Sequence, residues 1–231
     1  LDYLCGIGPI TLGYNYKVVN DAIIQQLKDG ILFSLPHPIE VELSELLSQT
    51  IPHAEMVKFE KTGSNAVTGA VRAARYITKR NKIAYCGSGG VWHDWWATVV
   101  SRDGGVPEFN RDLISIFDYN DIEGLEQIFE NNPNQIAAIV LEATIFEKPQ
   151  KDFLKKVRKI ADQNDTILIF TALIIYYSIN LFLYKSTKPQ NYKIFYFSFY
   201  FFSFNLKSKI SSFCFLYNSF NPYNTLAINF S

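Results

Sequence analysis

Apolar residues recur at helical spacing in two early stretches of the chain. In residues 20–27 and 40–51 they fall three and four positions apart, so that they line one face of a helix. Pro36 and Pro38 stand between the two stretches and interrupt the helical pattern. The sequence therefore predicts two amphipathic helices in an N-terminal segment, residues 1–50.

From residue 51 to residue 170, short apolar runs alternate with helical patterns. Apolar runs of strand length stand at residues 56–59, 82–86, 113–117, 136–141 and 166–170, and helical patterns at residues 66–76, 123–130 and 151–163. Parallel strands need crossover connections, and helices usually supply them. The pattern therefore predicts an α/β domain with a parallel-rich sheet over residues 51–170.

The composition changes abruptly after Phe170. Residues 171–231 hold 11 Phe, 8 Tyr, 9 Ser and 7 Asn, but no Gly, Val or Trp and no acidic residue. Phe, Tyr, Asn, Lys and Ile are the residues that A- and T-rich codons specify. Our first interpretation is that this segment is an aberrant low-complexity tail, translated from a retained intron or in a shifted reading frame.

A membrane anchor is the rival interpretation of the same junction. Residues 166–184 form an uncharged, mostly apolar run of 19 residues, which is long enough to span a bilayer. However, residues 166–170 are also expected as a strand of the sheet, so a span would remove that strand from the core. The sequence by itself leaves both interpretations open.

The charge balance and the cysteines of the chain indicate which binding partners and which cellular compartment to expect. The chain has 22 Lys and Arg against 22 Asp and Glu, so neither sign favours nucleic acid or an anionic membrane as a partner. Cys5, Cys86 and Cys214 are widely spaced and odd in number, which predicts neither a disulfide framework nor a metal site. We therefore expect a cytoplasmic protein.

The most informative local motif is Lys-Thr-Gly-Ser-Asn-Ala at residues 61–66, between a predicted strand and a predicted helix. The first amides of a helix have no partner within it and carry the positive end of its dipole, so they bind anions. Gly63 lets the backbone approach a ligand closely, and Ser64 adds a hydroxyl. Ser and Asn are also preferred N-caps, so a purely structural cap explains the same residues.

Several separate stretches bear on this choice, because residues 6–170 resemble the first part of class III aminotransferases, especially their glutamate-1-semialdehyde aminomutase-like branch. The stretches that carry the resemblance are GPITLGYNY at 8–16, LPHPIEVEL at 35–43, the TGSNA turn with the helix after it, WHDWW at 92–96 and IVLE at 139–142. The resemblance implies the large domain of a fold-type I, aspartate aminotransferase-like enzyme, incomplete here.

The resemblance also implies a cofactor and its binding residues. Gly63, Ser64 and Asn65 would hold the phosphate of pyridoxal 5'-phosphate, and Glu142 would lie near the cofactor. The intact family would act on a small amino-acid-like substrate as a homodimer. A third possibility, an unrelated α/β phosphate-binding protein, lacks the Gly-x-Gly-x-x-Gly turn of dinucleotide-binding domains.

The chain departs from the family at three places that matter for catalysis. The family has a Tyr-His-Gly run whose aromatic ring stacks on the pyridine ring, whereas residues 89–91 read Gly-Gly-Val. In the family, the strand that resembles residues 167–170 is followed by an Asp that keeps the pyridine nitrogen protonated. This chain has Thr171 at that place. No lysine of residues 171–231 lies in a segment that resembles the covalent cofactor site.

These departures lead us to assign no catalytic residue to this chain. Our hypothesis is a fragment of an aminotransferase or aminomutase that is inactive as it stands. The alternative is a non-catalytic member of the family that pairs with an intact subunit.

Overall fold

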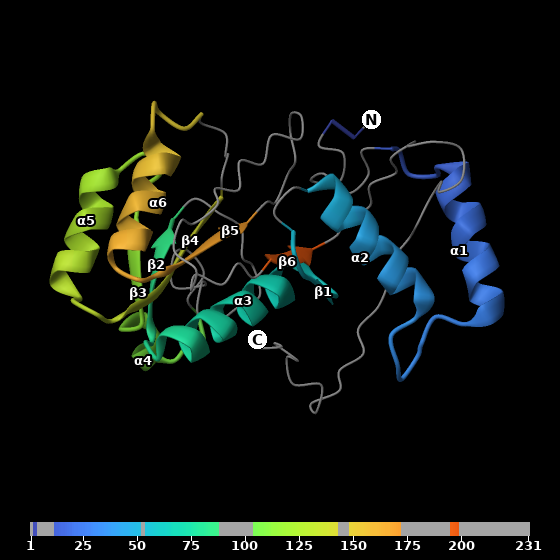
Figure 1. The fold of residues 1–231 in the computed structure, drawn as a ribbon, viewed down its shortest axis with the longest axis horizontal. Coiled ribbons are helices and arrows are strands. Elements are labelled where there is room, and N and C mark those ends of the chain that lie inside the picture. The colour runs from blue at the N-terminus through green and yellow to red at the C-terminus, as the bar shows by residue number, and fades with distance from the viewer. Residues whose placement is uncertain are drawn as a thin grey trace.

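The structure is a computed structural model, which describes residues 2–3, 12–51, 54–87, 104–142, 148–171 and 195–198, the last four by their backbone alone. Its elements, in chain order, are α1 (Lys17–Asp29), α2 (Pro38–Thr50), β1 (Val57–Glu60), α3 (Gly63–Thr78), β2 (Lys82–Cys86), α4 (Glu108–Arg111), β3 (Ile114–Phe117), α5 (Ile122–Asn131), β4 (Ile136–Glu142), α6 (Phe153–Gln163), β5 (Ile167–Thr171) and β6 (Phe195–Ser198) (Figure 1).

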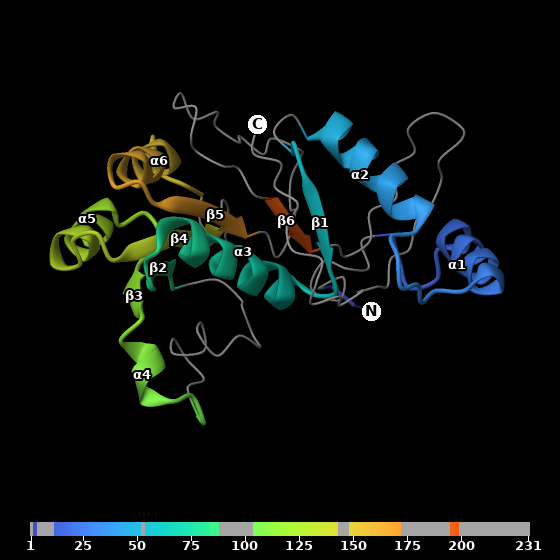
Figure 2. The ribbon, with the colours of Figure 1, turned by 60° about the horizontal axis from the view of Figure 1, so that its bottom comes forward.

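Four strands form a parallel sheet in the order β3-β2-β4-β5. The pairing of β4 with β5 runs from Ala138 opposite Ile167 to Glu142 opposite Thr171. A second, two-stranded sheet pairs β1 with β6, also in parallel. Figure 2 shows β6 lying between β5 and β1, with α3 running past all three.

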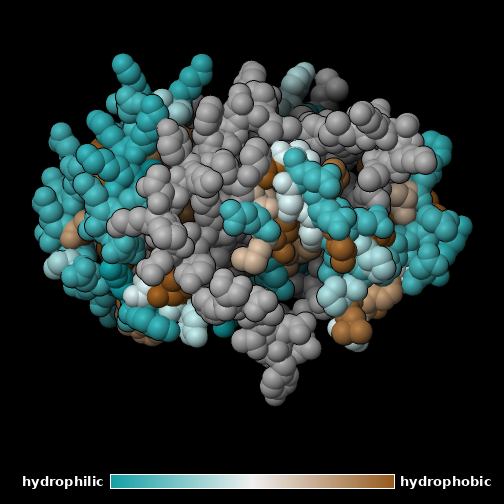
Figure 3. All heavy atoms as spheres, viewed as in Figure 1, coloured by the Kyte–Doolittle hydropathy of each residue, from teal (hydrophilic) through white to brown (hydrophobic). Residues whose placement is uncertain are grey.

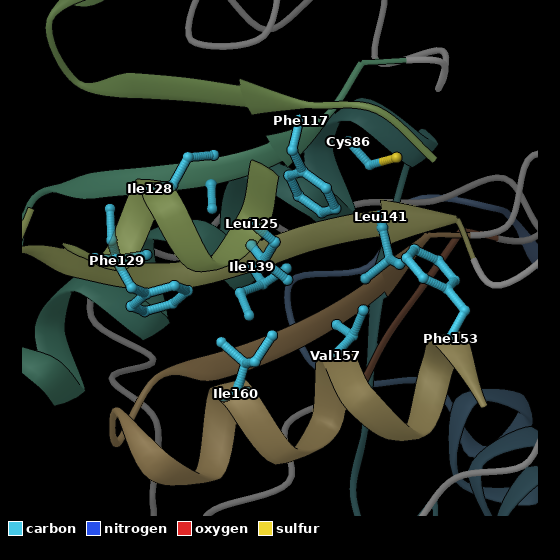
Figure 4. Packing of buried hydrophobic residues seen from close by; sticks show 13 residues of the cluster. Cys86, Phe117, Leu125, Ile128, Phe129, Ile139, Leu141, Phe153, Val157 and Ile160 are labelled. Atoms are coloured by element: carbon cyan, nitrogen blue, oxygen red, sulfur yellow. The ribbon is translucent and has the colours of Figure 1, made fainter. Parts of the chain in front are cut away.

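Helices cover both faces of the four-stranded sheet. Alternate residues of β4 point to opposite faces, so Ile139 and Leu141 pack with α5 and α6, whereas Ala138 and Val140 pack with α3. Figure 4 shows Leu125 of α5 and the apolar residues of α6 closing on the first of these faces. Because both faces are covered, β4 reads as an almost unbroken apolar run that ends at Glu142.

The sheet and the helices around it match the α/β pattern expected from the sequence. The strand at 82–86 is found at the predicted residues, and the other predicted strands and helices are displaced by a few residues at most. Two elements were not predicted, the single-turn α4 and the tail strand β6. Both α1 and α3 begin three residues before their predicted starts, and α3 therefore begins at Gly63, inside the predicted turn.

The proposed membrane span is divided by the fold. Its first residues belong to β5 and the turn before it, and residues 172–184 lie outside the described part of the chain. Within the described part, no helix is both long and apolar enough to cross a bilayer.

The N-terminal segment has a thinner core than the sheet domain. The buried apolar residues of α1 and α2 are Val19 and Leu47. Ile31, Leu32 and Leu35, in the connection between these helices, are exposed. In Figure 3 the surface over α5 and α6 is mostly hydrophilic, whereas hydrophobic residues reach the surface over α2 and this connection.

Candidate functional site

The start of α3 is capped by the residue before the glycine. Thr62 has an extended backbone, with φ −137° and ψ 162°, and its Oγ1 accepts a hydrogen bond from the amide of Asn65 at 3.2 Å. Its carbonyl accepts from the amide of Ala66 at 3.0 Å. The Thr62 hydroxyl also donates to Oδ1 of Asn65 at 2.7 Å. The capping role therefore belongs to Thr62, and Ser64 lies inside the first turn.

This arrangement leaves the two leading amides of α3 available. Within the described part of the chain, no hydrogen bond is formed by the backbone N–H of Gly63 or Ser64. Gly63 and Ser64 are half-buried, and Asn65 is exposed. Amides at the positive end of a helix that are not covered by protein can donate to an anion. Asn65 uses its amide and its Oδ1 in hydrogen bonds with Thr62, so of the three predicted residues only Gly63 and Ser64 keep a backbone N–H that forms no bond within the described part of the chain.

A carboxylate that the sequence analysis did not single out lies next to this turn. Glu60 ends β1, two residues before Thr62, and is half-buried. Burial raises the pKa of Glu60 above its ordinary value of 4.5, while the charge of Lys58 opposes that shift. The signal in the sequence was its place at the end of a strand before a glycine turn.

The fourth predicted site residue lies on another element. Glu142 ends β4 and is half-buried, at the carboxyl edge of the sheet. Its partner in the register is Thr171, the last residue of β5. The structure thus brings Gly63, Ser64 and Asn65 together in one turn and places Glu142 beside Thr171.

Other predicted features lie outside the described residues. They are the Gly-Gly-Val run at 89–91, the aromatic segment at 92–96 and the five tail lysines. The expectations for the stacking ring and for the covalent lysine therefore stay predictions.

The sequence profile of aminotransferase class-III matches residues 1–171, well over half of the chain. The chain belongs to the class III aminotransferase family. This confirms the resemblance found in the sequence, and pyridoxal phosphate is the cofactor that this family implies.

Two curated relatives show how much of a class III aminotransferase is present. The chain is 33% identical over 197 residues to glutamate-1-semialdehyde 2,1-aminomutase of Ignicoccus hospitalis, covering 78% of this chain and 46% of that protein. It is 38% identical over 177 residues to 3-aminobutyryl-CoA aminotransferase of Cloacimonas acidaminovorans, covering 74% and 42%. The chain therefore spans less than half the length of these relatives.

Solved structures agree with the fold. An omega-transaminase from Sphaerobacter thermophilus superposes with a TM-score of 0.69 at 28% identity, over 74% of this chain and 43% of that one. A transaminase with pyridoxal phosphate bound gives 0.69 at 25% identity, over 73% and 43%. The sheet and its helices are therefore those of a transaminase large domain, in part.

The described residues fit one end of the cofactor better than the other. The helix start at Gly63 and Ser64 offers two amides and a hydroxyl, which are the donors that a phosphate accepts from. At the carboxyl end of β5, Thr171 offers a hydroxyl at the position where the resemblance implies an aspartate. A hydroxyl cannot supply the negative charge that stabilises a protonated pyridine nitrogen. The residues fit the phosphate and do not fit the ring nitrogen.

Proposed function

We propose that the chain is the phosphate-binding part of a pyridoxal-phosphate-dependent aminotransferase or aminomutase, and that it does not catalyse amino-group transfer by itself. The backbone amides of Gly63 and Ser64, which bond to no described residue, are the observation that carries the binding half of this proposal. Thr171 carries the other half, because the ring nitrogen would lack its carboxylate partner. We place Glu142 near the ring as the neighbouring carboxylate.

The complete protein to which such a chain corresponds would move an amino group between an amino-acid-like donor and a carbonyl acceptor, as a homodimer in the cytoplasm. The names of the curated relatives support this reaction class, since they include an aminomutase and an aminotransferase. They differ in substrate, so the proposal extends to the class of reaction and not to one substrate.

Titration of the chain with pyridoxal 5'-phosphate, followed by fluorescence, tests the binding half. Removing a hydroxyl that bonds a charged group costs about 1.5–3 kcal/mol, so Ser64→Ala should weaken binding by roughly ten-fold or more. Thr78→Ala is the matched control, because its hydroxyl lies at the other end of α3 and donates to the carbonyl of Ala74. Equal affinities of the two variants would remove Ser64 from the site.

An amino donor and a keto acid added to the cofactor-loaded chain test the catalytic half. We expect no turnover, measured as keto-acid formation from the donor. Sustained turnover by the purified chain would show that the charge missing at Thr171 is supplied elsewhere.

The second candidate function is a non-catalytic subunit that pairs with an intact homologue. The observation in its favour is that the chain keeps the family sheet yet spans less than half of its relatives. Size-exclusion chromatography of the chain mixed with an intact relative tests it, with a hetero-dimer as the expected product.

A further inference from the structure

One segment of the C-terminal tail is built into the described fold. β6 pairs in parallel with β1 along the whole length of both strands, from Val57 opposite Phe195 to Glu60 opposite Ser198. Figure 2 shows the two strands side by side, and β6 also contacts α3. The sequence of β6 is Phe-Tyr-Phe-Ser, and aromatic residues favour strands. This part of the tail therefore belongs to the fold.

β1 depends on β6 for its partner strand. In the part of the chain that the structure describes, β1 and β6 form a two-stranded sheet of their own, and no ladder joins it to the four-stranded sheet. A strand packed against protein needs partners for its N–H and C=O groups, and a pair of strands is stable only when it packs against a further element. α3 supplies that packing, because it contacts both strands. Without β6, β1 would lie beside α3 with no described partner strand.

β1 in turn leads directly into the start of α3. A single residue separates Glu60, the last residue of β1, from Thr62, which caps the helix. The chain advances by at most about 3.6 Å per residue, so a shift of β1 would carry Thr62 with it. Thr62 accepts hydrogen bonds from the amides of Asn65 and Ala66 through its Oγ1 and its carbonyl. The position of β1 therefore sets the geometry in which α3 presents its leading amides.

A buried alanine in the first turn of α3 agrees with this dependence. Ala66 is 2% exposed, yet it does not belong to the apolar cluster in which Ala70 and Ala74 of the same helix pack with β2, β4 and β5. Beyond the four-stranded sheet, the described strands that α3 contacts are β1 and β6. The first turn of α3 is therefore buried apart from the larger sheet, at the end of the helix that follows β1.

We propose that β6 is a positioning strand for the phosphate site. By pairing with β1 it holds the residue that caps α3, and so it keeps the leading amides of the helix in place. The effect on phosphate binding rests on the proposed function, whereas the effect on the helix start does not. Amide exchange measures the order of the helix start, and cofactor titration measures phosphate binding, so the two can fail separately.

Pairs of cysteines in the full chain test the register of the two strands. Neighbouring strands lie about 4.8 Å apart, within the Cα separation that a disulfide accepts, so Lys58→Cys with Tyr196→Cys should cross-link on mild oxidation. Lys58→Cys with Ser198→Cys is the matched control, because an offset of two residues takes the Cα atoms beyond about 7 Å. Peptide mapping by mass spectrometry identifies the products. Equal cross-linking of the two pairs, or none in the first, would overturn the pairing.

Adjacent proline substitutions test the positioning role. Successive residues of a strand direct their N–H groups to opposite sides, so one of Tyr196 and Phe197 donates to β1 and the other does not. Proline has no N–H, so one of Tyr196→Pro and Phe197→Pro should speed exchange of the Asn65 and Ala66 amides by roughly five-fold or more. The same variant should weaken pyridoxal 5'-phosphate binding by a similar factor, and its neighbour should change both much less. Protection of the ladder between β2 and β4 in both variants shows that the larger sheet is intact.

Equal effects of the two prolines on the α3 amides, or no effect of either, would overturn the role of β6. Faster exchange in one variant with the same cofactor affinity in both would show that β6 supports the fold without positioning the site. If the unaltered chain binds no pyridoxal 5'-phosphate, the proposed function fails, and exchange of the α3 amides still decides whether β6 holds the helix start. If the prolines unfold the larger sheet, the cross-linked Lys58→Cys, Tyr196→Cys chain decides, because oxidation should slow exchange of these amides relative to the reduced form.

Discussion

Glu142 lies opposite Thr171 at the carboxyl ends of β4 and β5. Neighbouring strands are about 4.8 Å apart, so any charge placed at residue 171 acts directly on Glu142. The resemblance to the family implies an aspartate at that position, which would make a pair of carboxylates here. The chain therefore keeps the carboxylate of β4 and lacks the one expected on β5.

Restoring that carboxylate should change cofactor affinity and stability in opposite directions. We expect Thr171→Asp to raise affinity for pyridoxal 5'-phosphate several-fold, because it supplies a negative charge for a protonated ring nitrogen. It should also lower the free energy of unfolding by roughly 0.2–1 kcal/mol through repulsion with Glu142. Fluorescence titration and urea unfolding measure the two effects. If Thr171→Asn raises affinity as much as Thr171→Asp, charge is not the cause.

Loss of the α3 cap should cost stability. Thr62→Ala removes the hydroxyl that accepts from the amide of Asn65, so the free energy of unfolding should fall by about 1 kcal/mol. Thr62→Ser keeps an acceptor at the same place and should cost much less. Urea unfolding followed by circular dichroism distinguishes them, and equal losses for both variants would mean that the methyl group matters more than the cap.

Because the pKa of Glu60 is raised, removing the charge of this residue should stabilise the folded chain by an amount that depends on pH. The folded chain holds the Glu60 proton more tightly than the unfolded chain, so this contribution to stability is complete below pH 4.5 and is lost as the pH rises through the folded pKa. Burial opposes the ionised form of this carboxylate, so removing the charge by Glu60→Gln should raise the melting temperature at pH 7.

The gain from Glu60→Gln should shrink as the pH falls toward 4, which thermal melts at several pH values will show. Glu55→Gln, at an exposed position just before β1, is the control and should leave the melting temperature unchanged. A gain that is the same at pH 4 and pH 7 would rule out the titration of Glu60 as its cause.

The core between α5 and α6 should tolerate little loss of volume. Leu125 is fully buried in this cluster, and its truncation to Ala should cost about 2–5 kcal/mol through lost burial and a cavity. Leu27→Ala removes the same atoms from an exposed position on α1, where the cost should stay within about 0.5 kcal/mol. Similar losses at the two sites in urea unfolding would show that α5 is not packed as the structure has it.

The sequence determined the sheet domain because periodicity reports burial directly. Continuous apolar runs such as residues 136–141 require cover on both faces, and the helical patterns between them supply it. The glycine turn at Gly63 was also recognisable, since its chemistry is local to a few residues. Family membership followed from the same stretch of chain.

Only the tertiary structure decided which residue caps α3, which carboxylate is desolvated and which strand ends the sheet. Thr62, rather than Ser64 or Asn65, takes the cap because its extended backbone directs Oγ1 at the amide of Asn65. The burial that raises the pKa of Glu60, the pairing of Glu142 with Thr171 and the place of β5 at the end of the described four-stranded sheet depend on how the chain packs. A residue pattern records which side chains are buried, but the identity of the partner across a strand or a helix is set only when the chain is packed.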